Sequence, residues 1–409
     1  MNILVVYDVN RGQKTRNALL ASIFCYKDYK DIHFYHYNYC GKLTYLGNYL
    51  KRMHFDAVIF HYSFLATMRW GTKEDYECIL DFFRESWNDS IKAIIPQDEY
   101  YKTGLSRRFI TETDVEIIYS LASKNDIDIL YPDTPNVKKY TVLTGYVDGK
   151  TFKKVERIKR ECTKERKYDI GYRARKVNYA LGKHGNLKAE LVNQMNKRLS
   201  GSDLVTNIKN TIDDKNVFWG DDWYRFLLDC KTVVGCNGGA SIMDVDGTIE
   251  SRVNQFLKMK SNASFKEVED AVLYNVDGNI QYKMISPRIF EAAMTKTCQI
   301  LVRDNYGPLK AGVHYIELSE DYSNIDEVIE KVRDTEYCRK IADNAYQLLI
   351  ASGDYSYTKF VRKVVNSLKK KMRDDNKKET TKEYRYVKLL LWIHELVLFI
   401  YNKIQSKVI

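Results

Sequence analysis

The residues best suited to chemistry lie in the segment 283–296, where a serine and a proline precede an apolar helical pattern. Ser286 is a favoured N-cap residue and Pro287 fits the first helical position, so we expect a helix to begin here. Amide groups at a helix start attract phosphate. Arg288 and Glu291 share a face of that helix, so a guanidinium could hold a diphosphate while a carboxylate accepts hydrogen bonds from hydroxyls. An ordinary surface pair of Arg and Glu is the alternative.

Two further segments follow predicted strands and could line the same site. In the turn 237–241, Asn-Gly-Gly-Ala-Ser, Gly239 permits close backbone approach to a ligand and Ser241 offers a hydroxyl. Arg173 and Arg175 lie at the end of another strand pattern, where cations could stabilise a departing diphosphate. We assign all four to ligand binding. A tight turn and solvent-exposed charges are the alternatives.

Metal sites are not favoured by the pattern of acids, cysteines and histidines. Asp244-Val-Asp246 could hold a divalent ion beside a diphosphate, but Asp-Gly is a common turn. The eight cysteines include no Cys-x-x-Cys pair, so neither a zinc site nor a disulfide framework is indicated. His33 and His36 fit an aromatic-rich strand better than a metal site. We therefore expect no metal and no cofactor.

The run Arg288-Ile-Phe-Glu-Ala-Ala is followed by an apolar strand pattern, Cys298 to Val302, and then by Asp304-Asn-Tyr-Gly. Together these resemble the donor-site helix and following loop of GT-B glycosyltransferases, and they are most similar to the bacterial branch related to spore-maturation glycosyltransferases. The segment 235–247 is similar to a glycine-rich turn of that branch. The resemblance covers about residues 232–346, and the N-terminal half matches in architecture alone.

This resemblance implies a nucleotide-sugar donor held mainly by the second half of the chain, with Glu291 on the ribose and Arg288 near the diphosphate. The four ligand-binding residues named above would complete that donor site. Many retaining members carry a second glutamate eight residues before the one in this helix, where this chain has Lys283. Inversion and retention at the anomeric carbon are therefore both open.

Transfer of a sugar passes through an oxocarbenium-like state, and an inverting enzyme needs a base for the acceptor hydroxyl. Four candidates follow strand patterns in the first half of the chain: Asp8, His61, Asp98 and Glu99. We favour Asp98, then Glu99, as catalytic residues, because packing explains poorly why two acids should follow a buried strand and a proline. A polar loop at the edge of the site is the alternative.

Short apolar runs alternate with helical stretches along the chain, which predicts βαβ units and parallel sheets covered on both faces. No Gly-x-Gly-x-x-Gly follows the first strand pattern of either half, so a nicotinamide or flavin enzyme is disfavoured. We expect an α/β chain with two Rossmann-like domains facing across a cleft, the GT-B arrangement, and a C-terminal helical tail. The predicted strands are 3–7, 57–62, 93–95, 116–119 and 127–131, then 168–172, 232–235, 298–302 and 314–318.

The predicted boundaries give an acceptor-side domain at 1–155, a nucleotide-sugar-binding domain at 156–350, a closing helix at 351–375 and a basic, apolar tail at 376–409. Residues 360–409 contain 13 Lys or Arg against 5 Asp or Glu, which is +8 of the net charge of +11. The body is therefore nearly neutral, which disfavours a nucleic-acid-binding protein despite a pI of about 9.0 and 32 tyrosines.

The apolar pattern at 386–401 is shorter than the ~20 residues that span a membrane. We expect the tail to dock on the inner leaflet, with burial on the body or in an oligomer as the alternative. The sequence thus predicts a metal-independent glycosyltransferase that is cytoplasmic and peripheral to the membrane. It would move a sugar from a nucleotide-sugar donor to a glycan or lipid-linked acceptor, in the synthesis of surface polysaccharide or glycoconjugates. A non-catalytic nucleotide-sugar-binding scaffold is the main rival, and a nucleic-acid-binding protein is a weaker one.

Overall fold

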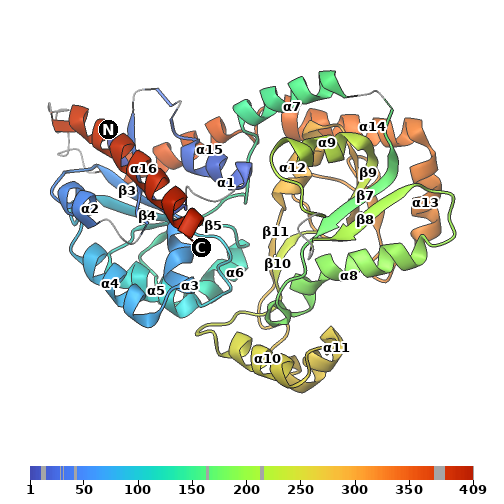
Figure 1. The fold of residues 1–409 in the computed structure, drawn as a ribbon, viewed down its shortest axis with the longest axis horizontal. Helices are drawn as coiled ribbons and strands as arrows, with labels where there is room; N and C mark the ends of the chain where they lie inside the picture. The colour runs from blue at the N-terminus through green and yellow to red at the C-terminus, as the bar shows by residue number, and fades with distance from the viewer. Residues whose placement is uncertain are drawn as a thin grey trace. The chain divides into compact units, whose positions relative to one another are not determined.

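The computed structural model divides the chain into two compact units, which are described separately (Figure 1). The first unit consists of residues 1–142 and 360–409, and the second consists of residues 143–359. The structure describes residues 1–10, 15–27, 29–30, 32–40, 44–162, 165–211, 216–372 and 383–408.

The first unit is built on a six-stranded parallel sheet in the order β2-β1-β3-β4-β5-β6. Every residue of β1 and β3 is buried, as expected for central parallel strands covered on both faces. The strands are β1 (Asn2–Tyr7), β2 (His33–Asn38), β3 (Ala57–His61), β4 (Ile91–Ile95), β5 (Ile117–Ser120) and β6 (Lys138–Thr141). The helices between them are α1 (Asn17–Phe24), α2 (Thr44–Lys51), α3 (Tyr62–Trp70), α4 (Lys73–Arg84), α5 (Thr103–Glu112) and α6 (Lys124–Leu130).

The second unit contains a five-stranded parallel sheet in the order β13-β12-β9-β7-β8 and a short antiparallel pair, β10-β11. The strands are β7 (Tyr168–Ala174), β8 (Thr206–Asn210), β9 (Cys230–Gly235), β10 (Gly238–Ala240), β11 (Tyr282–Met284), β12 (Cys298–Val302) and β13 (Ile316–Leu318). The helices are α7 (Gly149–Glu161), α8 (Gly182–Arg198), α9 (Asp221–Asp229), α10 (Thr248–Met259), α11 (Phe265–Val268), α12 (Pro287–Met294), α13 (Ile325–Arg333) and α14 (Thr335–Tyr346). Two Rossmann-like domains are therefore confirmed.

The prediction of a strand at 127–131 is wrong, because this segment lies in helix α6. Ser123 caps the helix by accepting a hydrogen bond from the Asp126 N–H. The buried residues Asp126, Ile127 and Leu130 follow helical spacing, which a short apolar run cannot distinguish from a strand.

The boundary between the units lies earlier than the predicted one, after Val142. Residues 143–155 belong to the second unit because the Val147 N–H donates to the carbonyl of Tyr355 over 2.8 Å. Val155 and Ile158 of α7 pack into the hydrophobic core of the same unit. This packing places α7 in the second unit.

Helices α15 (Tyr357–Lys371) and α16 (Glu383–Val408) bring the chain back to the first unit. In α15, the Ser367 and Tyr119 hydroxyls lie 2.5 Å apart, and Lys363 donates to the Thr141 carbonyl over 2.7 Å. Helix α16 contacts β2 and α2. From residue 383 onward, the predicted tail is therefore part of the first domain, whereas residues 376–382 lie outside the described residues. None of the described helices has both the length and the apolar character needed to cross a bilayer.

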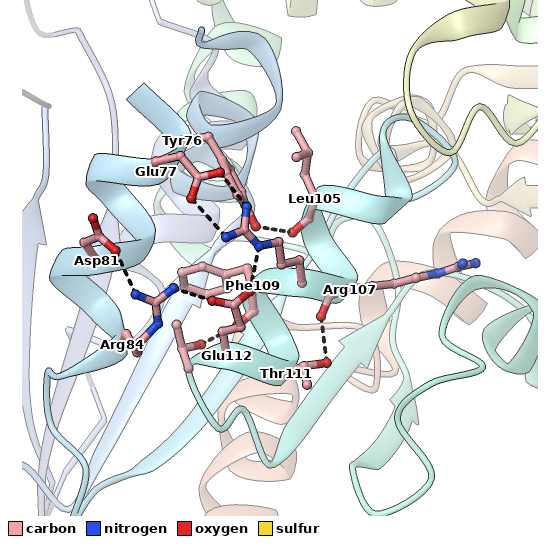
Figure 2. Close-up of polar contacts among 11 residues, drawn as sticks. Tyr76, Glu77, Asp81, Arg84, Leu105, Arg107, Phe109, Thr111 and Glu112 are labelled. Atoms are coloured by element: carbon pink, nitrogen blue, oxygen red, sulfur yellow. Dashed lines mark hydrogen bonds and ion pairs between the residues drawn. The ribbon is translucent and has the colours of Figure 1, made fainter. Parts of the chain in front are cut away.

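Helices α4 and α5 are joined on the surface of the first unit by a network of ion pairs (Figure 2). Arg108 of α5 contacts both Glu77 of α4 and Glu112 of its own helix, and Arg84 of α4 contacts Glu112. These groups are partly exposed, so salt screens their attraction and the network orients the helices more than it stabilises them.

Candidate functional site

The carboxyl ends of β7, β9 and β12 meet at one edge of the second sheet, where ligands bind in folds of this kind. Helix α12 begins near this edge. Ser286 accepts a hydrogen bond from the Arg288 N–H, and Pro287 is the first helical residue. The predicted helix start is therefore confirmed.

Basic side chains from three elements gather at this edge. Lys283 of β11 donates to Asp304, which follows β12, over 3.1 Å. Lys188 of α8 lies beside Gly238, since a Cβ built on that glycine would be 3.3 Å from the Lys188 ammonium nitrogen. A ring nitrogen of His184 lies 3.2 Å from the Gly238 carbonyl oxygen. We call His184, Lys188, Lys283 and Arg288 the basic cluster.

The pKa values of two neighbouring groups are influenced by charges of the basic cluster. Burial raises the pKa of the Cys236 thiol to about 11, while Lys188 and Arg288 act to lower it and Asp304 acts to raise it. Burial lowers the pKa of His184, and Lys283 and Lys188 act in the same direction, while the Gly238 carbonyl and Asp304 oppose this shift. His184 is therefore mainly neutral at physiological pH, and the lysines and Arg288 supply the positive charge.

Arg288 and Glu291 come together around an indole ring, as their shared helix face predicted. The Arg288 guanidinium lies 5.1 Å from the ring centroid of Trp223 and donates to the carbonyl of Arg173. The indole N–H of Trp223 donates to the Glu291 carboxylate over 2.8 Å. The sequence did not single out Trp223, because nothing in its local pattern on α9 distinguishes it from a core aromatic residue.

Of the two arginines predicted at the end of β7, Arg173 is buried and points into the fold. Its guanidinium donates to the carbonyl and side-chain oxygens of Asn207 and lies 4.4 Å from the ring centroid of Phe226. Burial lowers its pKa. Arg175 is exposed beyond the end of β7. Donor binding by these arginines stays a prediction, and the contacts of Arg173 point to a packing role.

Gly239 and Ser241 also make contacts that organise the fold. Gly239 has a φ of 122°, and a Cβ there would lie 1.9 Å from the Tyr282 carbonyl oxygen on the paired strand β11. The close backbone approach that this glycine permits is thus between two strands. The Ser241 hydroxyl donates to Asp277 over 2.6 Å and accepts from the His184 N–H over 3.1 Å, which fixes the start of α8. Their donor-binding roles stay predictions.

The carboxylate of Asp244 accepts hydrogen bonds from the backbone N–H groups of Gly247, Ile249 and Glu250 at the start of α10. Asp246 accepts from the Thr248 N–H over 2.9 Å. The two acids therefore form the turn that begins this helix. Among the described residues, no group of three or more His, Cys, Asp or Glu side chains could hold a metal ion.

Asn237, just after β9, is buried, and its amide nitrogen donates to the Asn305 carbonyl over 3.0 Å. Within the described part of the chain, its buried side-chain oxygen has no hydrogen-bond partner. A buried amide oxygen without a partner is costly, so a ligand hydroxyl or N–H would be well placed here.

In the first unit, the two acids after β4 have different surroundings. The carboxylate of Glu99 is buried and accepts hydrogen bonds from the Ser120 hydroxyl, the Leu121 N–H and the Tyr131 hydroxyl. Asp98 is exposed and has a φ of 52°. Catalysis by either acid stays a prediction, but the contacts of Glu99 are those of a structural group.

The guanidinium of Arg69 holds the loop that carries Asp98. It donates to the carbonyls of Asp98 over 2.5 Å and of Gln97 over 2.7 Å. Lys102 donates in turn to the Arg69 carbonyl over 2.8 Å. The position of the exposed Asp98 is therefore set by contacts with the backbone around it.

Asp8 follows β1 and is partly buried. Burial raises its pKa to about 6, and the hydroxyl of Thr67, which donates to its carboxylate over 3.0 Å, opposes this shift. Nearby, the ring nitrogens of His61 lie 3.0 Å from the Ser22 and Ser63 hydroxyls, and burial lowers the His61 pKa to about 3. His61 is therefore neutral and enclosed, whereas Asp8 titrates close to neutral pH.

No protein-family model matches the sequence, and no curated protein matches it. Among solved structures, the chain is similar to TarM over 79% of its length, with 13% identity and a TM-score of 0.48, and it spans 57% of the TarM chain. It is similar over 90% of its length to HepE of Anabaena in complex with UDP and glucose, with 10% identity and a TM-score of 0.47, covering 100% of that chain. It is also similar over 90% of its length to an α-glucosyltransferase in complex with UDP, with 10% identity and a TM-score of 0.49, covering 100% of that chain. These neighbours are GT-B glycosyltransferases.

Replacing Glu99 by Gln tests its structural role. Gln turns one acceptor oxygen into an NH2 group that faces donors, so we expect a loss of about 1 to 3 kcal/mol in the free energy of unfolding. The matched control is Asp98→Asn, which should unfold at the parent's denaturant midpoint. An E99Q variant as stable as the parent would contradict the structural reading.

Replacing Asp8 by Asn tests its burial. The rise in pKa from 3.8 to about 6 means that the folded state disfavours the charged carboxylate. The charged form lowers the free energy of unfolding by at most about 3 kcal/mol. This destabilisation is absent below pH 4, grows as the pH rises and is complete above pH 6. Asp8→Asn should therefore melt higher than the parent at pH 7.5 and at the same temperature at pH 4. An equal melting temperature at both pH values would show that Asp8 has an ordinary pKa.

Proposed function

We propose that this protein is a glycosyltransferase whose second unit binds a nucleoside diphosphate sugar. One observation carries the proposal, namely that the basic cluster converges with Glu291 and the start of α12 at the carboxyl edge of the second sheet. Cations, helix amides and a fixed carboxylate are the groups that recognise a diphosphate and an adjoining ribose.

The charges of the basic cluster suit the chemistry of the leaving group. Breaking the bond between the sugar and the diphosphate leaves negative charge on the diphosphate, and Lys188, Lys283 and Arg288 are placed to neutralise it. Prepositioned cations can supply the charge that a divalent ion supplies elsewhere, so the proposed transfer is independent of metal.

Glu291 and Asn237 suit recognition of the sugar and nucleotide. The Trp223 N–H orients the Glu291 carboxylate, which can accept hydrogen bonds from ribose hydroxyls. The buried side-chain oxygen of Asn237 can accept from a further donor group on the ligand. Together these residues would distinguish a nucleotide sugar from a simple phosphate.

The first unit would supply the base for the acceptor hydroxyl of a glycan or a lipid-linked sugar. Asp98 is exposed after β4, and Asp8, after β1, has a pKa of about 6 that suits proton transfer near neutral pH. The enclosed contacts of Glu99 and His61 make them poorer candidates. Asp8 therefore joins Asp98 as a leading candidate, and an inverting reaction would use one of them.

A double variant in which both Lys283 and Arg288 are replaced by Ala should lose its stabilisation by a nucleotide ligand. We expect a nucleoside diphosphate from a panel that includes UDP, ADP and GDP to raise the melting temperature of the parent, because a ligand bound to the folded state stabilises it. Each single variant should weaken binding at least about tenfold, since each loses a charge-assisted contact with the diphosphate. The control is Lys331→Ala, which removes a surface ion pair on α13.

Two results would contradict this assignment. The first is a nucleotide that stabilises the K283A and R288A variants as strongly as the parent. The second is a parent that no diphosphate or nucleotide sugar stabilises. Donor binding without hydrolysis or transfer would instead identify a sugar-binding scaffold.

Replacing the catalytic base should reduce transfer without reducing donor affinity. If Asp8 is the base, Asp8→Asn should lower kcat about 10² to 10⁴-fold and leave the donor Kd unchanged. The parent's kcat/KM should then fall as the pH drops through about 6, because the carboxyl becomes protonated. The same loss in Asp98→Asn, with Asp8→Asn active, would assign the base to Asp98. Full activity in both variants would exclude both acids.

A further inference from the structure

Helix α16 has two apolar faces. One face packs on the first unit through Tyr384, Val387, Leu391 and Leu398, all of which are buried. The other face is exposed although its residues are large and apolar. It consists of Tyr386, Leu389, Trp392, Ile393, Leu396, Val397, Phe399, Ile400 and Tyr401, each between 42% and 64% exposed. We call these nine residues the outer face of α16.

The outer face is too extensive to be scattered surface hydrophobics. The nine residues follow one another along four turns of a helix that runs along the first unit (Figure 1). Helix α2, which contacts α16, also carries the exposed rings of Tyr45 and Tyr49. Contiguous apolar surface of this kind marks a site of association with a membrane or another protein.

Charge distinguishes between these partners. Between residues 386 and 403, the exposed residues outside the outer face are Lys388 and Lys403. No exposed residue of this segment is acidic. The last turn of α15 contains Lys369, Lys370 and Lys371, of which Lys371 pairs with Glu116 over 3.1 Å. Glu395 is partly buried and is hydrogen-bonded by Tyr7. Two copies pairing through this face would bring like charges together, whereas an anionic lipid surface complements them.

The composition of the outer face also suits the interface of a bilayer. Trp and Tyr rings favour the depth of the lipid headgroups, and Leu, Ile and Phe side chains favour the adjoining acyl region. The inner face of α16 stays packed on protein, so the helix can lie in the interface without leaving the domain.

Polar contacts fix α16 to the end of the sheet that carries Asp8. A ring nitrogen of His394 lies 2.7 Å from the Asn38 carbonyl oxygen, at the end of β2. The Asn38 side chain bonds to both the N–H and the carbonyl of Val9 over 3.0 Å, and Tyr7 bonds to Glu395. The outer face is thus held in a fixed relation to the residues that follow β1.

We propose that the outer face of α16 docks the protein on a bilayer that contains anionic lipids, and that the acceptor is an amphiphile presented from this bilayer beside the carboxyl end of β1. The statement about the acceptor rests on the proposed glycosyltransferase function, whereas the docking does not. A lipid-linked acceptor would then reach the enzyme by diffusing within the plane of the membrane, and its sugar would lie beside Asp8.

Vesicle flotation tests the docking with the full-length protein. We expect the parent to float with vesicles of equimolar phosphatidylglycerol and phosphatidylcholine, and much less with phosphatidylcholine alone. The triple variant W392S/L396S/I400S should bind at least about tenfold less, because three apolar side chains no longer enter the bilayer. Point changes are preferable to removal of the helix, which would uncover the core residues Val387 and Leu391.

The matched control is M259S/Y274S, which removes two large side chains of the second unit that are 76% and 72% exposed. It should float like the parent. The triple variant should keep the parent's melting temperature and response to nucleotides, so that a loss of flotation cannot be ascribed to unfolding or to a lost donor site.

Three outcomes would overturn the docking. The first is a parent that does not float with anionic vesicles, and the second is a triple variant that floats like the parent. The third is a parent that forms a dimer and does not bind vesicles, when the triple substitution makes it a monomer. The last would assign the outer face to a second copy of the chain. None of them bears on the donor site, because flotation uses neither donor nor acceptor. A failed nucleotide response with intact flotation would reject the proposed function and leave the docking in place.

Discussion

The gathering of positive charge near the start of α12 is the constraint on which the proposed function of the second unit depends. Lys188, Lys283 and Arg288 lie near the positive end of α12, and Lys283 donates a hydrogen bond to Asp304. Holding like charges together costs free energy unless an anion shares the space. A diphosphate bound at this edge of the sheet would place its negative charge beside these cations.

The residues around the basic cluster illustrate how a fold provides such a site. Gly239 lets two strands approach closely, Ser241 fixes the start of α8, and Asp244 begins α10. Arg173 is buried beneath Phe226 and offers its backbone carbonyl to Arg288. Residues that look chemically active in sequence thus support the backbone, while Trp223 donates a hydrogen bond to the Glu291 carboxylate that we propose binds the donor.

Several buried polar groups of the first unit are likewise held by contacts inside the fold, and Asp8 differs from them in its titration. Glu99 and Arg69 find several partners inside the fold, and His61 lies between two hydroxyls. Asp8 is held by Thr67, yet burial still raises its pKa. Helix α16 is fixed to the same end of the sheet by hydrogen bonds, so Asp8, whose pKa is about 6, and a large apolar surface belong to the same part of the domain.

The sequence by itself determined the α/β class, most strands of both sheets, and the helix that begins at Pro287, because buried parallel strands and helix caps leave local patterns. It misassigned residues 127–131, since a short apolar run fits a strand and a buried helix equally well. The tertiary structure alone decided that 360–372 and 383–408 join the first unit, and that Lys188, Lys283 and Arg288 gather at one edge of the second sheet. It also decided that Arg173 and Glu99 point into the fold. Contacts between residues distant in the chain depend on how strands are ordered and helices packed, and no local pattern encodes that order.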